Sequence, residues 1–365
     1  MQSEHPPATR IAYFEYLRTY ATVGVVLLHA SSLLLSKVYS HEVSPFWSEA
    51  TVVSAYETAG RFAVNCFFMI SGALLLDPSR RFRLGRQASR VAIPLVIWSG
   101  AYILANWFYA RHDKPLVGGT VGEPNLHAPI ELVRNFLSGG VAVHLWFVYV
   151  LLGIYLVVPL LRAVTNQPEP QRRSLLLYAL GLWGVFQVGM TLGPRVWDGW
   201  PDIYSGLLPD FPMSYLGIFL LGFVLHTYRV PGGKPLYLAM VVIGFVWIVW
   251  QFWYEHHEPG RSTWSTDNLQ PPIILLSAGV FLLAKTVMSP AAVTGPLVSL
   301  FSRLSFRIYL VHLLVLDAWR HLSPLSDFYW DHPVLAVPLV TVLTVLSSFA
   351  IAWLIEQIKP IRSYV

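Results

Sequence analysis

Long apolar segments alternate with short polar connections along the whole chain. We expect ten of these segments to form transmembrane helices, because a helix needs about 20 mostly apolar residues to cross a bilayer. They are centred near residues 11–36, 52–76, 88–110, 143–163, 174–193, 211–228, 235–254, 270–288, 302–321 and 333–356. The pattern predicts an all-α polytopic membrane protein that forms one membrane-embedded domain over residues 1–365, with no appended soluble domain.

Composition supports a membrane protein. Hydrophobic residues make up 55% of the chain and charged residues only 12%, whereas a soluble domain carries about 25% charged residues. The 14 Trp and 18 Tyr are typical of side chains at membrane interfaces. The net charge of +5 comes from short loops between apolar segments, so it does not indicate nucleic acid as a partner. Cys66 is the single cysteine and excludes an internal disulfide.

Loop charges orient the predicted helices. With the N-terminus in the cytoplasm, the inner loops hold most basic residues, above all the run RRFRLGRQASR from Arg80 to Arg90. Ten crossings then return the C-terminus to the cytoplasm. Most acidic residues fall in the outer loops: Glu42, Glu49, Glu57, Asp113, Glu123, Asp198, Asp202, Glu255, Glu258, Asp327 and Asp331.

The first apolar segment carries ionisable residues that a lipid-facing helix has little reason to hold. Arg18 and His29 are eleven positions apart, which is three helical turns plus roughly 20°, so they share one face about 16 Å apart along the axis. Glu15 and Thr22 lie one turn to either side of Arg18 on nearly that face. Arg18 alone is explained by snorkelling to headgroups, paired with Glu15, and His29 alone by an interhelical hydrogen bond. Together on one face they favour a function.

The second segment holds Arg61, Asn65 and Ser71. Arg61 falls at the predicted outer mouth, where it would contact headgroups or an anionic or sugar substrate. For Ser71 and the adjacent Gly72, close helix packing is the favoured interpretation over catalysis.

Three other stretches contain candidate polar groups. The arginines of the Arg80–Arg90 run (Arg80, Arg81, Arg83, Arg86 and Arg90) suit anionic lipid or a phosphorylated donor, and the two functions are compatible. His144 and Trp146 fit an interfacial aromatic belt. Ser305, Tyr309 and His312 lie close on one helical face, with His312 interpreted first as a packed, hydrogen-bonded histidine. The run EHHE from Glu255 to Glu258 is rejected as a metal site, because its adjacent histidines do not share a helical face.

Four ordered stretches resemble a known family. YLRTYATVGVVLLH, with an arginine, ten residues and a histidine, is similar to the first-helix signature of the acyltransferase family 3 integral-membrane proteins, of the polysaccharide- and lipopolysaccharide-modifying type. FFMISGALLL, HLWFVYVLLGIYLVVPLL and SFRIYLVH resemble its other recurrent stretches in the same order. Glu15 stands where the family often has aspartate. Some relatives carry an extra helix and an extracytoplasmic domain, which we do not expect here.

The resemblance implies transfer of an acyl group, commonly acetyl, from cytoplasmic acyl-CoA to a carbohydrate hydroxyl, in a multi-pass protein of the bacterial inner membrane. It implies that Arg18 and His29 are the essential pair, with Arg61, Ser71 and the surroundings of Trp146 as lesser candidates. Acyl-CoA is then the donor substrate and no metal is required. The expected partners are membrane lipid, a carbohydrate acceptor or its lipid-linked form, and other polysaccharide-assembly proteins.

Two mechanisms and two other functions remain open. His29 is either the general base for the sugar hydroxyl or is itself acylated first. Arg18 and the Arg80–Arg90 arginines would hold the donor from inside. A transporter or flippase for a lipid-linked sugar would use the same polar face as a substrate path. A polysaccharide polymerase would need a larger outer loop than residues 111–140 provide.

Overall fold

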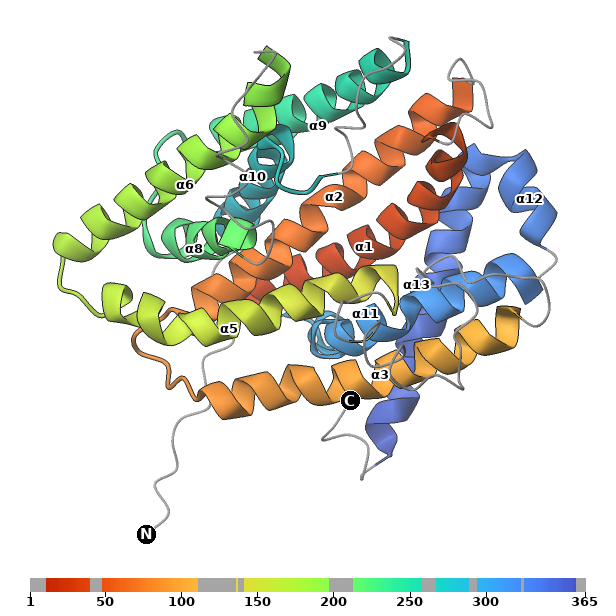
Figure 1. Cartoon of the computed structure of the whole chain (residues 1–365), viewed down its shortest axis with the longest axis horizontal. Helices are drawn as coiled ribbons and strands as arrows, with labels where there is room; N and C mark the ends of the chain where they lie inside the picture. The colour runs from red at the N-terminus through yellow and green to blue at the C-terminus, as the bar shows by residue number, and fades with distance from the viewer. Residues whose placement is uncertain are drawn as a thin grey trace.

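The fold of the chain is given by a computed structural model (Figure 1), which describes residues 11–39, 48–110, 136, 141–196, 213–257, 267–288, 294–322 and 325–358. All regular elements in these ranges are helical, and each of the ten predicted segments coincides with a helix. The elements are α1 (Ala12–Tyr39), α2 (Ser48–Leu75), α3 (Leu84–Ala110), η1 (Val143–Leu145), α5 (Trp146–Thr165), α6 (Gln171–Val196), α8 (Met213–Thr227), α9 (Gly233–His257), α10 (Pro271–Val287), α11 (Pro296–Leu322), α12 (Leu325–Asp331) and α13 (Pro333–Gln357).

Two of the helices that match predicted transmembrane segments are too short to cross a bilayer alone. Within the described ranges, eight helices are long and apolar enough to span a membrane, and α8 and α10 have only 15 and 17 residues. At 1.5 Å per residue they measure about 23 and 26 Å, less than the ~30 Å hydrocarbon core. Pro271 and Pro272 start α10, where the lost N–H groups have no intrahelical acceptor anyway. The protein is an all-α polytopic membrane protein, while the cytoplasmic position of its termini stays a prediction.

Helices α1 and α2 form the centre of the bundle. α1 packs along α2, and it also contacts α11 and α13. α2 also contacts α8, α9 and α10, which lie with α6 on its other side (Figure 1). The helix that carries Arg18 and His29 is therefore enclosed by protein over much of its length, and its polar face points into the bundle rather than into lipid.

Glycines allow the central helices to approach closely. A Cβ added at Gly60 of α2 would lie 2.4 Å from the carbonyl oxygen of Gly24 in α1. A Cβ at Gly72 would lie 1.8 Å from the carbonyl oxygen of Phe219 in α8, and one at Gly222 would lie 2.1 Å from that of Met69. Such small-residue contacts are typical of membrane helix pairs. They confirm the packing role expected for Gly72.

Two sequence-based boundaries were wrong. Glu57, expected in an outer loop, lies inside α2 and is buried. The run from Arg80 to Arg90 is not wholly a loop, because α3 already begins at Leu84. Helix α12 and the single turn η1 were not predicted, since seven and three residues are too few to show a helical period. The chain ends, including Lys359 and Arg362, and most expected outer loops lie outside the described residues.

Candidate functional site

The α1 helix is continuous over Ala12–Tyr39, so Arg18 and His29 do lie on one face. Both side chains are half-buried. Thr22, between them, is buried and returns its hydroxyl to the carbonyl of Arg18 at 2.7 Å. This face therefore presents a cation at one end and an imidazole about 16 Å further along.

Three histidines from distant parts of the sequence meet beside α1. The ring centroid of His29 lies 5.2 Å from that of His312 in α11 and 6.5 Å from that of His144 in η1. The rings of His144 and His312 are also 5.2 Å apart. His144 and His312 are buried, whereas His29 keeps some exposure. We call His29, His144 and His312 the histidine cluster.

Tyrosines hold the backbone around the histidine cluster. Tyr309 donates a hydrogen bond to the carbonyl of His144, and Tyr102 of α3 donates to the carbonyl of Leu310 at 3.0 Å. Tyr329 of α12 donates to the carbonyl of Ala30, next to His29. These bonds tie η1 and α3 to α11, and α12 to α1. Tyr102 and Tyr329 were not among the predicted site residues, because nothing in their local sequence marks them.

The structure corrects the predicted place of His144. The ring is not in an interfacial belt but 1% exposed in the interior, with the Tyr102 and Tyr309 rings 5.0 and 5.3 Å away. Trp146, two residues on, is half-buried and lies 5.1 Å from the ring of Tyr215 in α8. Tyr309 and His312 do share one face of α11, at 5.7 Å. Ser305, one turn earlier, is buried.

A buried ion pair lies next to the histidine cluster. Arg61 of α2 pairs with Glu57 at 2.7 Å, and Ser32 of α1 donates to the same carboxylate oxygen at 2.7 Å. Arg61 is only 3% exposed, which excludes the headgroup contact expected from the sequence. The positive charge of Arg61 is close enough to act on the His29 ring. The pair fixes α1 against α2 and supplies a buried cation whose charge is already balanced.

Asn65 and Ser71 have structural partners. Asn65 is fully buried and donates to the carbonyl of Asn268 at 2.9 Å, which joins α2 to the segment before α10. Ser71 donates to the carbonyl of Phe67 within its own helix at 2.8 Å, a bond typical of serine in membrane helices. Neither side chain lies in the histidine cluster.

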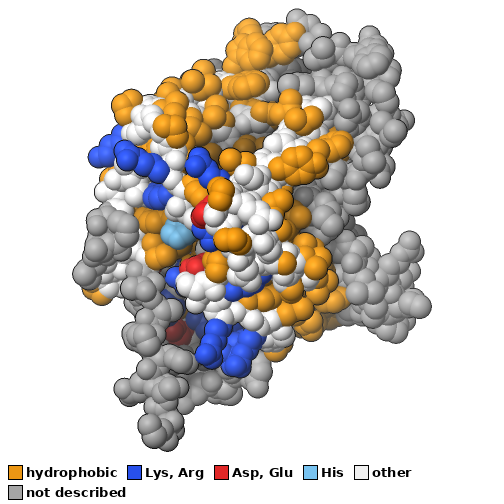
Figure 2. Space-filling view, turned by 90° about the vertical axis from the view of Figure 1, so that its left-hand side faces the viewer, with side chains coloured by type: hydrophobic (Ala, Val, Ile, Leu, Met, Phe, Trp, Pro, Cys, Tyr) orange, Lys and Arg blue, Asp and Glu red, His pale blue; other side chains and the backbone are white. Residues whose placement is uncertain are grey.

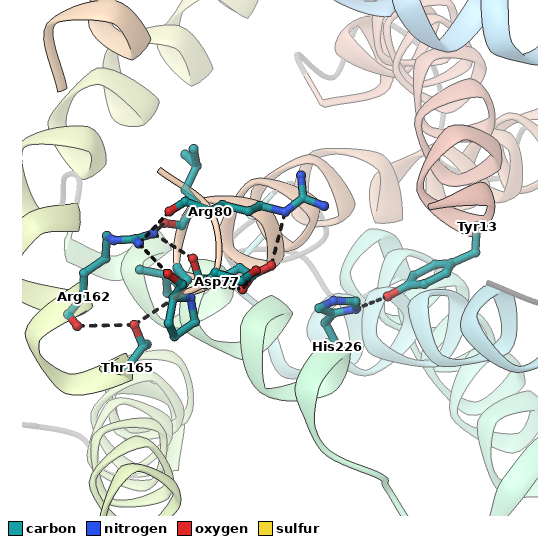
Figure 3. Close-up of polar contacts among 10 residues, drawn as sticks. Tyr13, Asp77, Arg80, Arg162, Thr165 and His226 are labelled. Carbon is teal, nitrogen blue, oxygen red and sulfur yellow. Dashed lines mark hydrogen bonds and ion pairs between the residues drawn. The ribbon is translucent and has the colours of Figure 1, made fainter. Parts of the chain in front are cut away.

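At the other end of α1, cations stabilise helix C-termini. We call the end of the bundle where α2, α5 and α8 finish the basic end; Figure 2 shows Lys and Arg side chains gathered on this face around acidic side chains and a histidine. Arg162 of α5 donates to four carbonyls at and just after the end of α2 (Figure 3), at distances of 2.7–3.4 Å: Leu75, Asp77, Pro78 and Arg80. Lys285 of α10 does the same for α8, donating to Leu225, His226 and Tyr228. Cations at helix C-termini are stabilising.

Two further contacts complete the basic end. Asp77 pairs with Arg80 at 3.2 Å and accepts from Ser79. Partial burial raises the pKa of Asp77, but the hydrogen bonds from Ser79 and Arg80 outweigh this effect and hold it below its usual range. Tyr13 at the start of α1 hydrogen-bonds with His226 at the end of α8, at 2.5 Å (Figure 3).

Arg18 differs from these cations. Within the described residues its guanidinium makes no hydrogen bond and no ion pair, although Glu15, Arg80 and Tyr155 lie within electrostatic range. Glu15 accepts a hydrogen bond from Thr294 before α11 and does not form the ion pair with Arg18 that snorkelling suggested. Tyr155 of α5 is buried and lies within range of both Arg18 and Arg90. The arrangement leaves a cation available for an anionic ligand.

The remaining predicted arginines lie on the surface. Arg81, Arg83, Arg86 and Arg90 are exposed, and none of their guanidinium groups makes a hydrogen bond or ion pair with the described residues. Arg80, by contrast, is half-buried and paired with Asp77. The described chain holds no group of three His, Cys, Asp or Glu side chains placed to bind a metal. The side chains of the run from Glu255 to Glu258 lie outside the described residues.

Comparison with known proteins gives one finding. A family model described as an acyltransferase domain matches residues 11–355, which is nearly the whole chain. No curated protein and no solved structure matches. The match covers every described helix from α1 to the greater part of α13, so the histidine cluster and Arg18 both lie inside it.

Proposed function

The chain belongs to this acyltransferase family, and we propose that it transfers an acyl group, acetyl in the simplest case, from acyl-CoA to a hydroxyl of a cell-surface carbohydrate or of its lipid-linked precursor. The observation that carries the proposal is the polar face of α1. It joins Arg18, a cation with no ion pair in the described part of the chain, to a half-buried imidazole, His29, across about half a bilayer.

The donor is proposed to bind at the basic end. Arg18 has like-charged neighbours there, with Arg80 within electrostatic range and Arg90 sharing the neighbourhood of Tyr155. A group of guanidinium ions with few carboxylates suits phosphate, which accepts paired hydrogen bonds from each planar fork. The nucleotide of CoA would lie near the exposed arginines, and its long arm would extend along α1 toward His29.

The acceptor is proposed to react at His29. Because a sugar hydroxyl is a poor nucleophile, a ring nitrogen of His29 takes its proton while the oxygen attacks the thioester carbonyl. The carbon–sulfur bond breaks, and the CoA thiolate takes this proton from the His29 imidazolium, which restores the neutral ring. Transfer through an acyl-His29 intermediate would use the same two sites in two steps. We assign the protein to the bacterial inner membrane, beside other polysaccharide-assembly proteins.

Two measurements test this function. Purified protein in detergent, supplied with acetyl-CoA and candidate glycans, should release free thiol only when an acceptor is present. Mass spectrometry of surface glycans from cells with and without the protein should show a difference of one acyl group. A transporter would leave the thioester intact in detergent, and unchanged glycan masses together with no thiol release would overturn the proposal.

A further inference from the structure

We propose that His312 is a positioning residue for His29. In this arrangement one ring N–H of His29 donates a hydrogen bond to Nε2 of His312, and the other ring nitrogen of His29 is left as the proton acceptor. The inference rests on the proposed function for its chemical consequence, but the pairing of the two histidines can be tested without any acyl transfer.

The tautomer of His312 follows from its backbone contact. Its Nδ1 lies 2.5 Å from the carbonyl oxygen of Tyr309. A carbonyl oxygen only accepts hydrogen bonds, so Nδ1 carries the proton and donates. In the neutral ring Nε2 then holds a lone pair and accepts. The backbone of α11 therefore decides which nitrogen of His312 faces the rest of the cluster.

The accepting nitrogen has no partner in the described residues. Nε2 of His312 is completely shielded from solvent and makes no hydrogen bond there. Leaving a buried acceptor unpaired is costly, so an arrangement that gives it a donor is favoured. Because this nitrogen is buried, substrate does not reach it directly. His312 is thus suited to act through a neighbouring group rather than on the substrate.

His29 is the neighbour that fits. Its side chain makes no hydrogen bond with the described residues and keeps some exposure. The two ring centroids are 5.2 Å apart, close to the ~5 Å that a bond of about 2.9 Å between two imidazole nitrogens requires. Rotation of the rings therefore suffices to form the bond. A neutral histidine that donates from one nitrogen accepts at the other.

His144 is the competing donor. Its ring is also 5.2 Å from that of His312, and it lies within hydrogen-bonding range of the backbone of Leu310. It is buried, however, and does not lie on the polar face of α1 with Arg18. A hydrogen bond from His144 to Nε2 of His312 would not fix the orientation of the His29 ring. Arg61, whose charge acts on His29, is neutralised by Glu57.

The test compares two replacements of similar size. His312→Gln keeps an oxygen that accepts a hydrogen bond, whereas His312→Met does not. We expect His312→Met to lower kcat for acetyl transfer about 10- to 100-fold with the KM for acetyl-CoA within about twofold, and His312→Gln to restore most of the loss. Thr341→Val, a substitution in α13 at a buried hydroxyl that bonds within its own helix to the carbonyl of Val337, controls for the removal of a buried polar group.

A second measurement does not depend on the reaction. Carbethoxylation by diethylpyrocarbonate attacks unprotonated imidazole nitrogens, and peptide mass spectrometry reports the rate at His29. We expect that rate to fall several-fold in His312→Met and to stay near wild type in His312→Gln. Equal His29 labelling in wild type, His312→Met and His312→Gln would overturn the pairing. Acetyl transfer that is as low in His312→Gln as in His312→Met would overturn it as well. A loss of labelling that follows His144→Gln instead would identify His144 as the donor.

Discussion

The guanidinium of Arg18 lies within electrostatic range of the guanidinium of Arg80, and no carboxylate forms an ion pair with Arg18 among the described residues. Arg80 forms an ion pair with Asp77, whereas Arg18 has the Glu15 carboxylate within electrostatic range but forms no ion pair with it. Two like charges in a partly buried setting repel each other, and a polyanion bound between them removes the repulsion. This relationship leads to the first prediction.

Arg18→Lys is expected to weaken acyl-CoA binding. Lysine keeps the charge but loses the planar fork that contacts two phosphate oxygens. Loss of one bidentate contact predicts a roughly tenfold higher KM for acyl-CoA, equivalent to about 1.4 kcal/mol. Titration with acyl-CoA measures it directly. If Arg18→Lys binds and turns over acyl-CoA like wild type while acceptor affinity falls, Arg18 belongs to the acceptor site or to the structure.

Substitutions among the exposed arginines should be milder and depend on salt. Arg83 and Arg86 are solvent-exposed, and several arginines share the contact, so Arg86→Gln should change the KM for acyl-CoA by less than about threefold. Raising the salt concentration should diminish this difference, because in 1 M salt interactions between exposed charges are screened beyond about 3 Å. Michaelis constants for acyl-CoA, measured for wild type and Arg86→Gln at two ionic strengths, test this prediction. A large effect of Arg86→Gln that is insensitive to salt would instead indicate a specific contact.

His29→Ala should abolish acyl transfer without preventing folding. A general base contributes about 10²- to 10⁴-fold, and a residue that carries the acyl group contributes at least as much. His29→Gln should also be inactive, because glutamine forms hydrogen bonds but does not take the proton. Thiol release and the elution profile in detergent report activity and folding separately. Wild-type activity in well-expressed His29→Ala protein would exclude both mechanisms.

Gly72→Ala should destabilise the bundle strongly. The added methyl group would meet the carbonyl oxygen of Phe219 at 1.8 Å, so α2 and α8 must separate. Overpacking of this kind costs about 1–3 kcal/mol or more, which we expect to lower the midpoint of thermal unfolding by several degrees. Gly181→Ala on α6 is the matched control, because its methyl group meets nothing within 4 Å. Equal midpoints for the two variants would contradict the close α2–α8 contact.

Labelling can test the predicted orientation. Ser89 is exposed in the first turns of α3, and the single native cysteine, Cys66, is buried and gives little background. Ser89→Cys should resist a membrane-impermeant thiol reagent in intact cells and react after the cells are opened. Asp113→Cys, expected outside, serves as the positive control. Reaction of Ser89→Cys from outside would reverse the predicted topology.

The sequence by itself determined the helices and the polar face of α1. Both depend on local properties: the length of an apolar segment decides whether it crosses a bilayer, and helix geometry places Arg18 and His29 on one face. The same local logic predicted the packing role of Gly72, since a residue without a side chain inside an apolar helix favours close contact. It failed for Glu57, because a charge looks like a loop residue until its partner is known.

Only the tertiary structure decided which polar groups meet. His144 and His312 join His29 because η1 and α11 pack beside α1, and nothing in their own segments distinguishes a belt histidine from a buried one. Arg61 looked like an outer cation until Glu57 was found as its buried partner. Arg162 and Lys285 stabilise the C-terminal ends of helices far away in the sequence, which nothing in their own segments indicates. Charge balance and burial depend on neighbours from other helices, and the order of residues along one helix does not contain them.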